Sequence, residues 1–174
     1  IGLSSIFLPL ALSTLRSDIS IAAQDCGLVP SKGGAFTGEV SPAQLKSLGV
    51  SWVILGHSER REGFGGPASG ESSEHIAEKI KAAVDAGLKV MICCGEKKED
   101  RESGKTMEVV SSQLTPVARA LSSSDWDSVS IAYEPVWAVG EGSTPCSPAE
   151  AQRINAALRK FVHDTISPEA ALSF

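Results

Sequence analysis

The 174-residue sequence has little of what marks several classes of protein. The formal net charge is −5 and lysine and arginine form no dense run, so the basic patch that binds nucleic acid or a membrane surface is missing. No apolar run approaches the roughly 20 residues of a membrane-spanning helix. We therefore predict a protein that has neither nucleic acid nor a membrane among its partners.

The chain has four cysteines, and they show no metal-ligand spacing. Cys93 and Cys94 lie in an apolar run, where free cysteine behaves as a small hydrophobic residue; the others are Cys26 and Cys146. We predict free thiols, no metal and a reducing, cytoplasmic compartment. The first ten residues lack the basic segment of a secretory signal peptide. No methionine opens the chain, so we expect the natural N-terminus to lie upstream.

Short apolar runs recur along the chain and predict buried strands. The first 14 residues are apolar without clear periodicity and could form one strand that leads into a helix. A stretch rich in glycine and serine, 63–73, predicts a mobile loop, and residues 164–174 show no assignable pattern. The predicted strands span residues 19–23, 51–55, 89–94 and 129–131.

Helical signals separate these strands. Residues 41–44 and 147–150 each begin with Ser-Pro and end in glutamine or glutamate, which is the spacing of a capping box with proline at the first helical position. Apolar residues repeat at helical spacing over 76–84 and over 107–121, where Pro116 should kink the helix. The charged run 97–102 is typical of a solvated loop or the start of a helix.

The alternation of strands with helices predicts a parallel sheet in an α/β protein. Polar residues follow each predicted strand, namely Gln24, His57, Glu96 and Glu134. The carboxyl ends of parallel strands share one edge, and a (β/α)₈ barrel builds its active site there. An open doubly wound sheet would also place ligands at this edge, but no G-x-G-x-x-G follows the early strands. We therefore predict the barrel.

Glu134 ends the last predicted strand and precedes Pro135, which restricts the backbone and so directs the carboxylate. The apolar segment 136–142 then ends in glycines, as a hinged lid would. A glutamate before a proline is also common as a solvated strand cap, so this pair alone leaves both interpretations open. In a barrel, His57 would reach the same rim. A base of fixed direction beside an imidazole can share proton transfer next to a carbonyl.

Three stretches of the sequence are more specific than these general patterns. Residues 132–140 read Ala-Tyr-Glu-Pro-Val-Trp-Ala-Val-Gly, residues 52–61 read Trp-Val-Ile-Leu-Gly-His-Ser-Glu-Arg-Arg, and residues 34–42 read Gly-Ala-Phe-Thr-Gly-Glu-Val-Ser-Pro. Together they resemble the triosephosphate isomerase family; residues 22–26 match as well, and 93–97 more loosely. The resemblance implies an α/β fold, the (β/α)₈ TIM barrel. A barrel of this kind needs about 250 residues, so we expect a single partial domain over residues 1–174, with about strands 2 or 3 to 6.

The resemblance implies that the protein interconverts dihydroxyacetone phosphate and glyceraldehyde 3-phosphate, in glycolysis and gluconeogenesis, without cofactor or metal. It implies that Glu134 is the base and that His57 is the electrophile that polarises the substrate carbonyl. The amide of Gly140 would meet the substrate phosphate when the lid closes. The lid would comprise Pro135, Val136, Trp137, Ala138, Val139, Gly140, Glu141 and Gly142.

Supporting roles follow from the same resemblance. The Ser58 hydroxyl would hold the glutamate while the lid is open, Glu59 would be a carboxylate one layer behind the site, and Cys93 would pack behind the base. Glu59 and Arg60 could instead form only a surface ion pair worth about 0–1 kcal/mol. The resemblance also implies a cytoplasmic homodimer, with an interface made by Phe36, Thr37, Gly38, Glu39 and Arg60.

The sequence departs from the family in several places. The first strand and the last two strands have no counterpart, and residues 1–14 match poorly. Asp25 replaces an asparagine, the loop 65–73 is longer, Glu141 replaces a threonine, and residues 143–146 replace a lysine-threonine-alanine hinge. We expect the isolated chain to be weakly active or inactive. An inactive fragment or interaction remnant, and a different phosphate-binding barrel enzyme, therefore remain alternatives.

Overall fold

The computed structural model describes residues 1–29, 34–64 and 70–173. Its centre is a parallel sheet in which the strands lie side by side in the order of the chain. The strands are β1 (Gly2–Leu3), β2 (Ala22–Ala23), β3 (Trp52–Leu55), β4 (Lys89–Cys94) and β5 (Val129–Tyr133). The strand order does not reverse, as it would in a doubly wound sheet. The α/β class and the barrel type of sheet are therefore confirmed.

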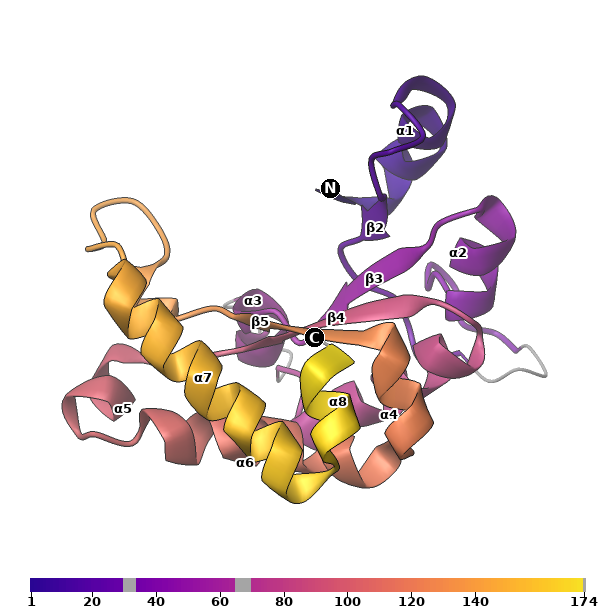
Figure 1. The fold of residues 1–174 in the computed structure, drawn as a ribbon. Coiled ribbons are helices and arrows are strands. Elements are labelled where there is room, and N and C mark those ends of the chain that lie inside the picture. The colour runs from indigo at the N-terminus through magenta and orange to yellow at the C-terminus, as the bar shows by residue number, and fades with distance from the viewer. Residues whose placement is uncertain (30–33, 65–69, 174) are drawn as a thin grey trace.

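Helices connect successive strands, as parallel pairing requires. Figure 1 shows α4, α6 and α7 together on one side of the sheet, with α8 packed beside α7. The α-helices are α1 (Leu8–Thr14), α2 (Pro42–Leu48), α3 (Ser58–Glu62), α4 (Ser73–Asp85), α5 (Lys98–Glu102), α6 (Thr106–Ala120), α7 (Pro148–Thr165) and α8 (Pro168–Ser173). The described residues also form three short 3₁₀ helices, η1 (Ser5–Phe7), η2 (Ser123–Ser128) and η3 (Val136–Ala138).

The core lies between the sheet and these helices. Successive side chains of a strand point to opposite faces, and the fully buried residues of β3 and β4 fall on one of them. These residues are Val53, Leu55, Val90 and Ile92, and they belong to one cluster with Ile76 and Ile80 of α4 and Leu114 of α6. Burying a side chain of this size contributes about 1.5–3 kcal/mol. This apolar layer fixes the strands and thereby the positions of the residues that follow them.

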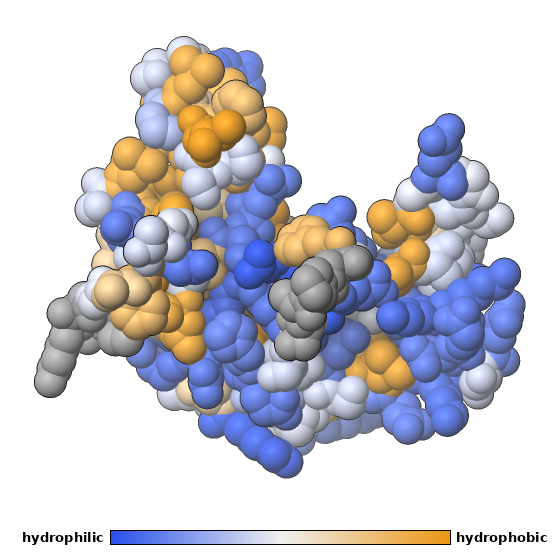
Figure 2. All heavy atoms as spheres, turned by 180° about the vertical axis from the view of Figure 1, so that it is seen from behind, coloured by the Kyte–Doolittle hydropathy of each residue, from blue (hydrophilic) through white to orange (hydrophobic). Residues whose placement is uncertain are grey.

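The other face and the sheet edges are less covered. Met91 of β4 points to that face and is 36% exposed. Among the described residues, β1 and β5 each pair with one neighbouring strand only. Figure 2 shows hydrophobic side chains gathered over the projecting N-terminal segment, where Ile6, Phe7 and Leu10 are exposed.

Several predicted element starts are confirmed. Ser41 and Gln44 form the complete capping box of α2, with side chain-to-backbone bonds of 3.2 and 2.8 Å. The first 14 residues form the expected strand and helix, and the run 97–102 contains the short helix α5. Part of the predicted loop 63–73 lies outside the described residues.

Other predictions were wrong. The strand predicted over 19–23 is reduced to β2, because residues 16–19 form a turn closed by a bond from the Ile19 N–H to the Arg16 carbonyl. At the start of α7, Ser147 caps the Glu150 N–H, but the Glu150 carboxylate pairs with Arg153 instead of completing a capping box.

Helix α6 contains Pro116 and continues on both sides of it. The kink expected at this residue stays a prediction. Residues 168–173, for which the sequence showed no pattern, form α8 and bury Ala170 and Ala171.

Candidate active site

The carboxyl ends of β3, β4 and β5 form one edge of the sheet, which we call the rim. It consists of residues 56–59 after β3, 93–96 at the end of β4, and Glu134 after β5. Parallel pairing of neighbouring strands in register brings these three segments together. His57 and Glu134 are 77 positions apart in sequence and are neighbours here.

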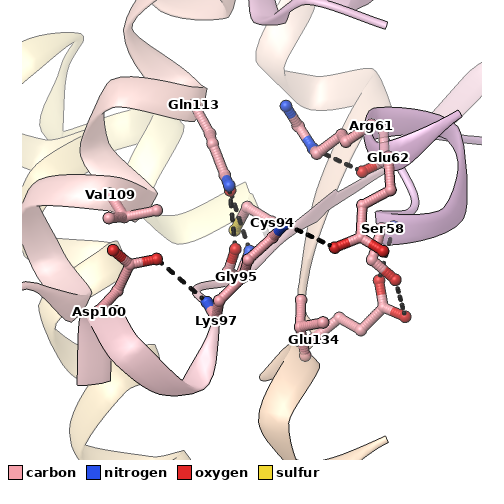
Figure 3. Close-up of a pocket in the computed structure, with 12 residues that line it drawn as sticks. Ser58, Arg61, Glu62, Cys94, Gly95, Lys97, Asp100, Val109, Gln113 and Glu134 are labelled. Atoms are coloured by element: carbon pink, nitrogen blue, oxygen red, sulfur yellow. Dashed lines mark hydrogen bonds and ion pairs between the residues drawn. The ribbon is translucent and has the colours of Figure 1, made fainter. Parts of the chain in front are cut away.

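Glu134 lies at the centre of the rim, with its side chain 16% exposed. Its Oε1 is 2.9 Å from His57 Nε2 and accepts a hydrogen bond of 3.2 Å from the Ser58 hydroxyl. Its Oε2 accepts a hydrogen bond of 3.3 Å from the Ser58 backbone N–H. Figure 3 shows Glu134 and Ser58 directed toward one another at the side of the adjacent cavity. The carboxylate is therefore surrounded by donors from the start of α3.

His57 is the N-cap of α3, and its Nδ1 accepts a hydrogen bond of 3.3 Å from the Glu59 N–H. A neutral imidazole that accepts at one nitrogen carries its proton on the other. We assign the proton to Nε2 on this hydrogen bonding, so that Nε2 donates to Glu134. The Glu59 carboxylate also lies 3.6 Å from Nδ1. This carboxylate is 69% exposed, and exposed charges interact weakly. The bond from the Glu59 backbone N–H therefore decides which nitrogen of His57 carries the proton.

The backbone of Glu134 is held by the end of β4. Its N–H donates to the Cys94 carbonyl over 2.8 Å, and the Val136 N–H donates to the Glu96 carbonyl over 3.1 Å. Pro135 between them has φ −65°, the value that its ring imposes. The direction of the carboxylate therefore depends on the exact position of residues 94–96.

Cys93 is buried at the end of β4, as packing behind the base requires. Burial, and to a smaller extent the charge of Glu134, raises the pKa of this thiol to about 12. The thiolate is the nucleophilic form of cysteine, so the raised pKa argues against a nucleophilic role for Cys93. Its packing behind the base stays a prediction.

The expected lid, residues 135–142, begins with η3 and ends in an exposed tip. Gly140 and Gly142 have φ values of +99° and +79°, which favour glycine. At its base, the Trp137 indole N–H donates to Glu96 over 2.8 Å, and the Arg101 guanidinium lies 3.6 Å from the indole ring centroid. The lid is therefore attached at its base and free in solvent at its tip.

The sequence patterns assigned no role to Glu96, which is 1% exposed. Its carboxylate accepts hydrogen bonds from the Tyr133 hydroxyl, the Trp137 indole and the Thr106 hydroxyl. Burial and the nearby Glu96 raise the pKa of Tyr133, so this phenol remains a donor. The available signal was the position of Glu96 directly after a buried strand. Glu96 joins β5, the lid and α6 at one point.

A set of charged side chains that the sequence did not reveal surrounds Lys79 of α4, which is 2% exposed. Its ammonium lies 2.6 Å from Asp25 and 2.9 Å from Glu71. Arg60 of α3 is 3.0 Å from Asp25 and also pairs with Glu71. Two positive and two negative groups therefore link β2, α3 and α4, and we call them the ion cluster. Arg60, expected at an interface, is paired within the chain.

The other expected interface residues lie in an exposed segment. Phe36 is 40% exposed, and Thr37, Gly38 and Glu39 are exposed as well. Burial lowers the pKa of Arg60, but the hydrogen bond to Glu71 and the charges of Asp25, Glu71 and, last, Glu39 raise it above its ordinary value.

In the described parts of the chain, no group of three or more His, Cys, Asp or Glu side chains is arranged to hold a metal ion. No helix among them is long and apolar enough to cross a membrane. A parallel sheet in chain order, with a carboxylate and an imidazole in contact at its carboxyl edge, defines a barrel-type α/β protein equipped for proton transfer. The comparison with known proteins is more specific: the chain belongs to the triosephosphate isomerase family, whose family description matches residues 2–173.

A curated relative is similar over most of the chain. The cytosolic triosephosphate isomerase of Oryza sativa subsp. japonica is 46% identical over 168 residues, which are 97% of this chain and 62% of the relative. The chain therefore spans less than two thirds of the length of that relative.

Proposed function

We propose that the whole protein to which this chain belongs is a triosephosphate isomerase that interconverts dihydroxyacetone phosphate and D-glyceraldehyde 3-phosphate. The observation that carries the proposal is the contact of 2.9 Å between His57 Nε2 and Glu134 Oε1 at the rim. Membership of the family and the similarity to the rice enzyme support it.

The proposed reaction uses Glu134 as base and His57 as electrophile. Glu134 removes a proton from the carbon next to the substrate carbonyl and returns it to the neighbouring carbon. The Nε2–H of His57 donates to the carbonyl oxygen, where negative charge develops in the transition state. The proton of the neighbouring hydroxyl moves to this oxygen, so that the old carbonyl becomes a hydroxyl as the new carbonyl forms. In the structure both groups bond to each other, and Ser58 also bonds to Glu134. The substrate must replace these contacts, so Glu134 turns from Ser58 and His57 toward the substrate carbon.

The lid would complete the site. Its exposed tip contains Gly140, whose N–H we assign to the substrate phosphate after closure. Closure excludes water, which strengthens the electrostatic interactions inside a site. Glu59 and Cys93 would support His57 and Glu134 without touching substrate. Because base and electrophile both come from the chain, the proposed reaction needs no cofactor.

We also propose a cytoplasmic homodimer. The exposed Phe36 in the segment 36–39 would be covered by a second subunit, since a large apolar side chain in water favours association. The name of the rice relative includes the cytosol, which supports the compartment.

The test is an isomerase assay of the whole protein and of its Glu134→Gln variant. Glutamine keeps the size of the side chain and cannot accept the proton, so kcat should fall by at least about 10²-fold. An inactive parent protein would favour the alternative of an inactive remnant. An active parent with an unaffected variant would show that another group is the base.

A further inference from the structure

Gln113 of α6 makes two hydrogen bonds to a single residue of the rim. Its Oε1 accepts from the Gly95 N–H over 2.9 Å, and its Nε2 donates to the Gly95 carbonyl over 2.9 Å. Figure 3 shows the side chain reaching from the helix to Gly95 with both bonds in place. Only one orientation of the amide satisfies both bonds, so the pair fixes Gly95 in position and in rotation.

Gly95 in turn lies directly against the backbone of Glu134. A Cβ added at Gly95 would be 1.7 Å from the Glu134 carbonyl oxygen, so no side chain fits between them. The residues on either side of Gly95 bond to Glu134 and Val136 through the carbonyls of Cys94 and Glu96. A shift of Gly95 must therefore shift the main chain that carries the base.

The surroundings make this contact sensitive to the loss of Gln113. A cavity of about 610 Å³ is lined by Gly95, Gln113, Ser58 and Glu134, among others. Without the Gln113 amide, the N–H and carbonyl of Gly95 would face this cavity, where water can bond to them in several arrangements. Gly95 would then have no single preferred position.

We propose that Gln113 is a positioning residue for Glu134: it sets the location of the base through Gly95, without touching substrate. The inference rests on the proposed function, because it gives Glu134 the role of base. A misplacement of a catalytic group by about 1 Å can cost roughly 10²-fold in rate. The two hydrogen bonds of Gln113 act on Gly95, which contacts the Glu134 backbone, so their loss has a measurable effect on turnover.

The main test replaces Gln113 by methionine, which has a similar length and makes neither bond. In the whole protein, Gln113→Met should lower kcat by about ten- to a hundredfold, with KM within about twofold because substrate contacts remain. Gln113→Glu keeps the acceptor for the Gly95 N–H and loses the donor. Gln113→Glu should also lower kcat, and it provides the test if the methionine variant does not fold.

Gln44→Met is the matched control. Gln44 also accepts a hydrogen bond from a backbone N–H, that of Ser41 over 2.8 Å, but it belongs to α2 and lies outside the rim. It should lower the unfolding midpoint and leave kcat unchanged. If Gln113→Met behaves like Gln44→Met, with a loss of stability and a normal kcat, Gln113 has only a structural role and the inference is wrong.

Amide hydrogen exchange separates this inference from the proposed function. Gln113→Met should accelerate exchange at Gly95, Glu134 and Val136, while the amides of β3 remain as protected as in the parent. This result would support the positioning role even if the parent protein had no isomerase activity. Unchanged exchange at Glu134 and Val136 would overturn it, whatever the activity.

Discussion

The rim and the lid are adjacent in the chain and are held in opposite ways. In the rim, side chains from two helices bond to the backbone: Arg61 of α3 donates to the Gly56 and Cys93 carbonyls, and Gln113 of α6 bonds to Gly95. The lid is attached at its base, where the Trp137 indole donates to Glu96, and its tip is exposed. Catalytic groups need fixed geometry and covers need freedom to move. The boundary between the two regions falls at Pro135.

The rim and the lid differ because their backbone polar groups form hydrogen bonds with different partners. Rim carbonyls are covered by helices, and a covered polar group without a partner costs about 1–3 kcal/mol, so each is matched by a donor from a neighbouring element. The lid tip is exposed to solvent instead, and its Gly140 carbonyl accepts a bond from the nearby Ser143 hydroxyl over 2.8 Å. The rim is therefore expected to lose stability when a partner is removed, whereas the lid is expected to change its mobility.

The largest effect is expected at the ion cluster, which links α3 to α4 and to the segment after β2. Lys79→Met removes a buried ammonium and leaves Asp25 and Glu71 with only Arg60 as a cation. Breaking a buried ion pair on one side costs about 3–5 kcal/mol, which chemical denaturation would measure. Lys81→Met, in the same helix, removes an exposed pair with Asp85 and should change stability little. Equal effects for both would show that the ion cluster does not stabilise the fold more than an exposed ion pair does.

The second prediction concerns the direction of the base. Glu134→Asp withdraws the carboxylate by one methylene from the position that Ser58 and His57 define. In the whole protein, kcat should fall about a hundredfold, with KM almost unchanged. Glu59→Asp, at a largely exposed carboxylate, should have a smaller effect. A comparable fall for both variants, in steady-state kinetics, would contradict the assignment of Glu134 as the only base.

Trp137→Phe tests the attachment of the lid. It removes the indole N–H that donates to Glu96 but keeps an aromatic ring for Arg101 to cover. A hydrogen bond to a charged group is worth about 1.5–3 kcal/mol, so amides over 136–142 should exchange about tenfold faster or more. Exchange at Gly95 should stay as in the parent, because Gln113 holds it. Faster exchange in both regions would mean that rim and lid are one unit.

The last prediction is a dependence of stability on alkaline pH. Burial raises the pKa of Cys93 and of Cys94 from 9.0 to about 12. Below pH 9 both folded and unfolded chains keep these protons, so the thiols add no pH dependence there. Above pH 9 the unfolded chain loses them first, and the free energy of unfolding should fall by up to about 1.4 kcal/mol per pH unit for each thiol, until the folded state also ionises near pH 12.

Denaturant unfolding between pH 8 and 10 checks this slope. Cys93→Ala removes one of the thiols and should make the decline shallower. The exchange rate of the lid amides, corrected for the intrinsic effect of pH, should not follow the same trend. An unchanged slope in Cys93→Ala would show that other groups cause the loss of stability.

The sequence by itself determined the local structure and the order of the elements. Apolar runs and capping signals such as Ser41 with Gln44 act between residues close in the chain, so the strands, most helix starts and the parallel sheet could be predicted. The same reasoning placed His57 and Glu134 on one rim, because parallel strands end on the same edge. It failed where a local alternative was equally good: residues 16–19 close a turn, and the Glu150 carboxylate pairs with Arg153.

Tertiary structure alone decided the contacts that support the rim. Gln113 and Gly95 are 18 positions apart, and Lys79 and Asp25 are 54 apart. Neither pair shows a spacing that a periodic pattern could reveal, and a glutamine or lysine on a helix is usually solvated. Only when α4 and α6 pack on the sheet does Lys79 become buried beside two carboxylates and Gln113 partly buried beside the Gly95 backbone. The hydrogen bonds form there because leaving those groups unpaired would cost more than ordering the side chains.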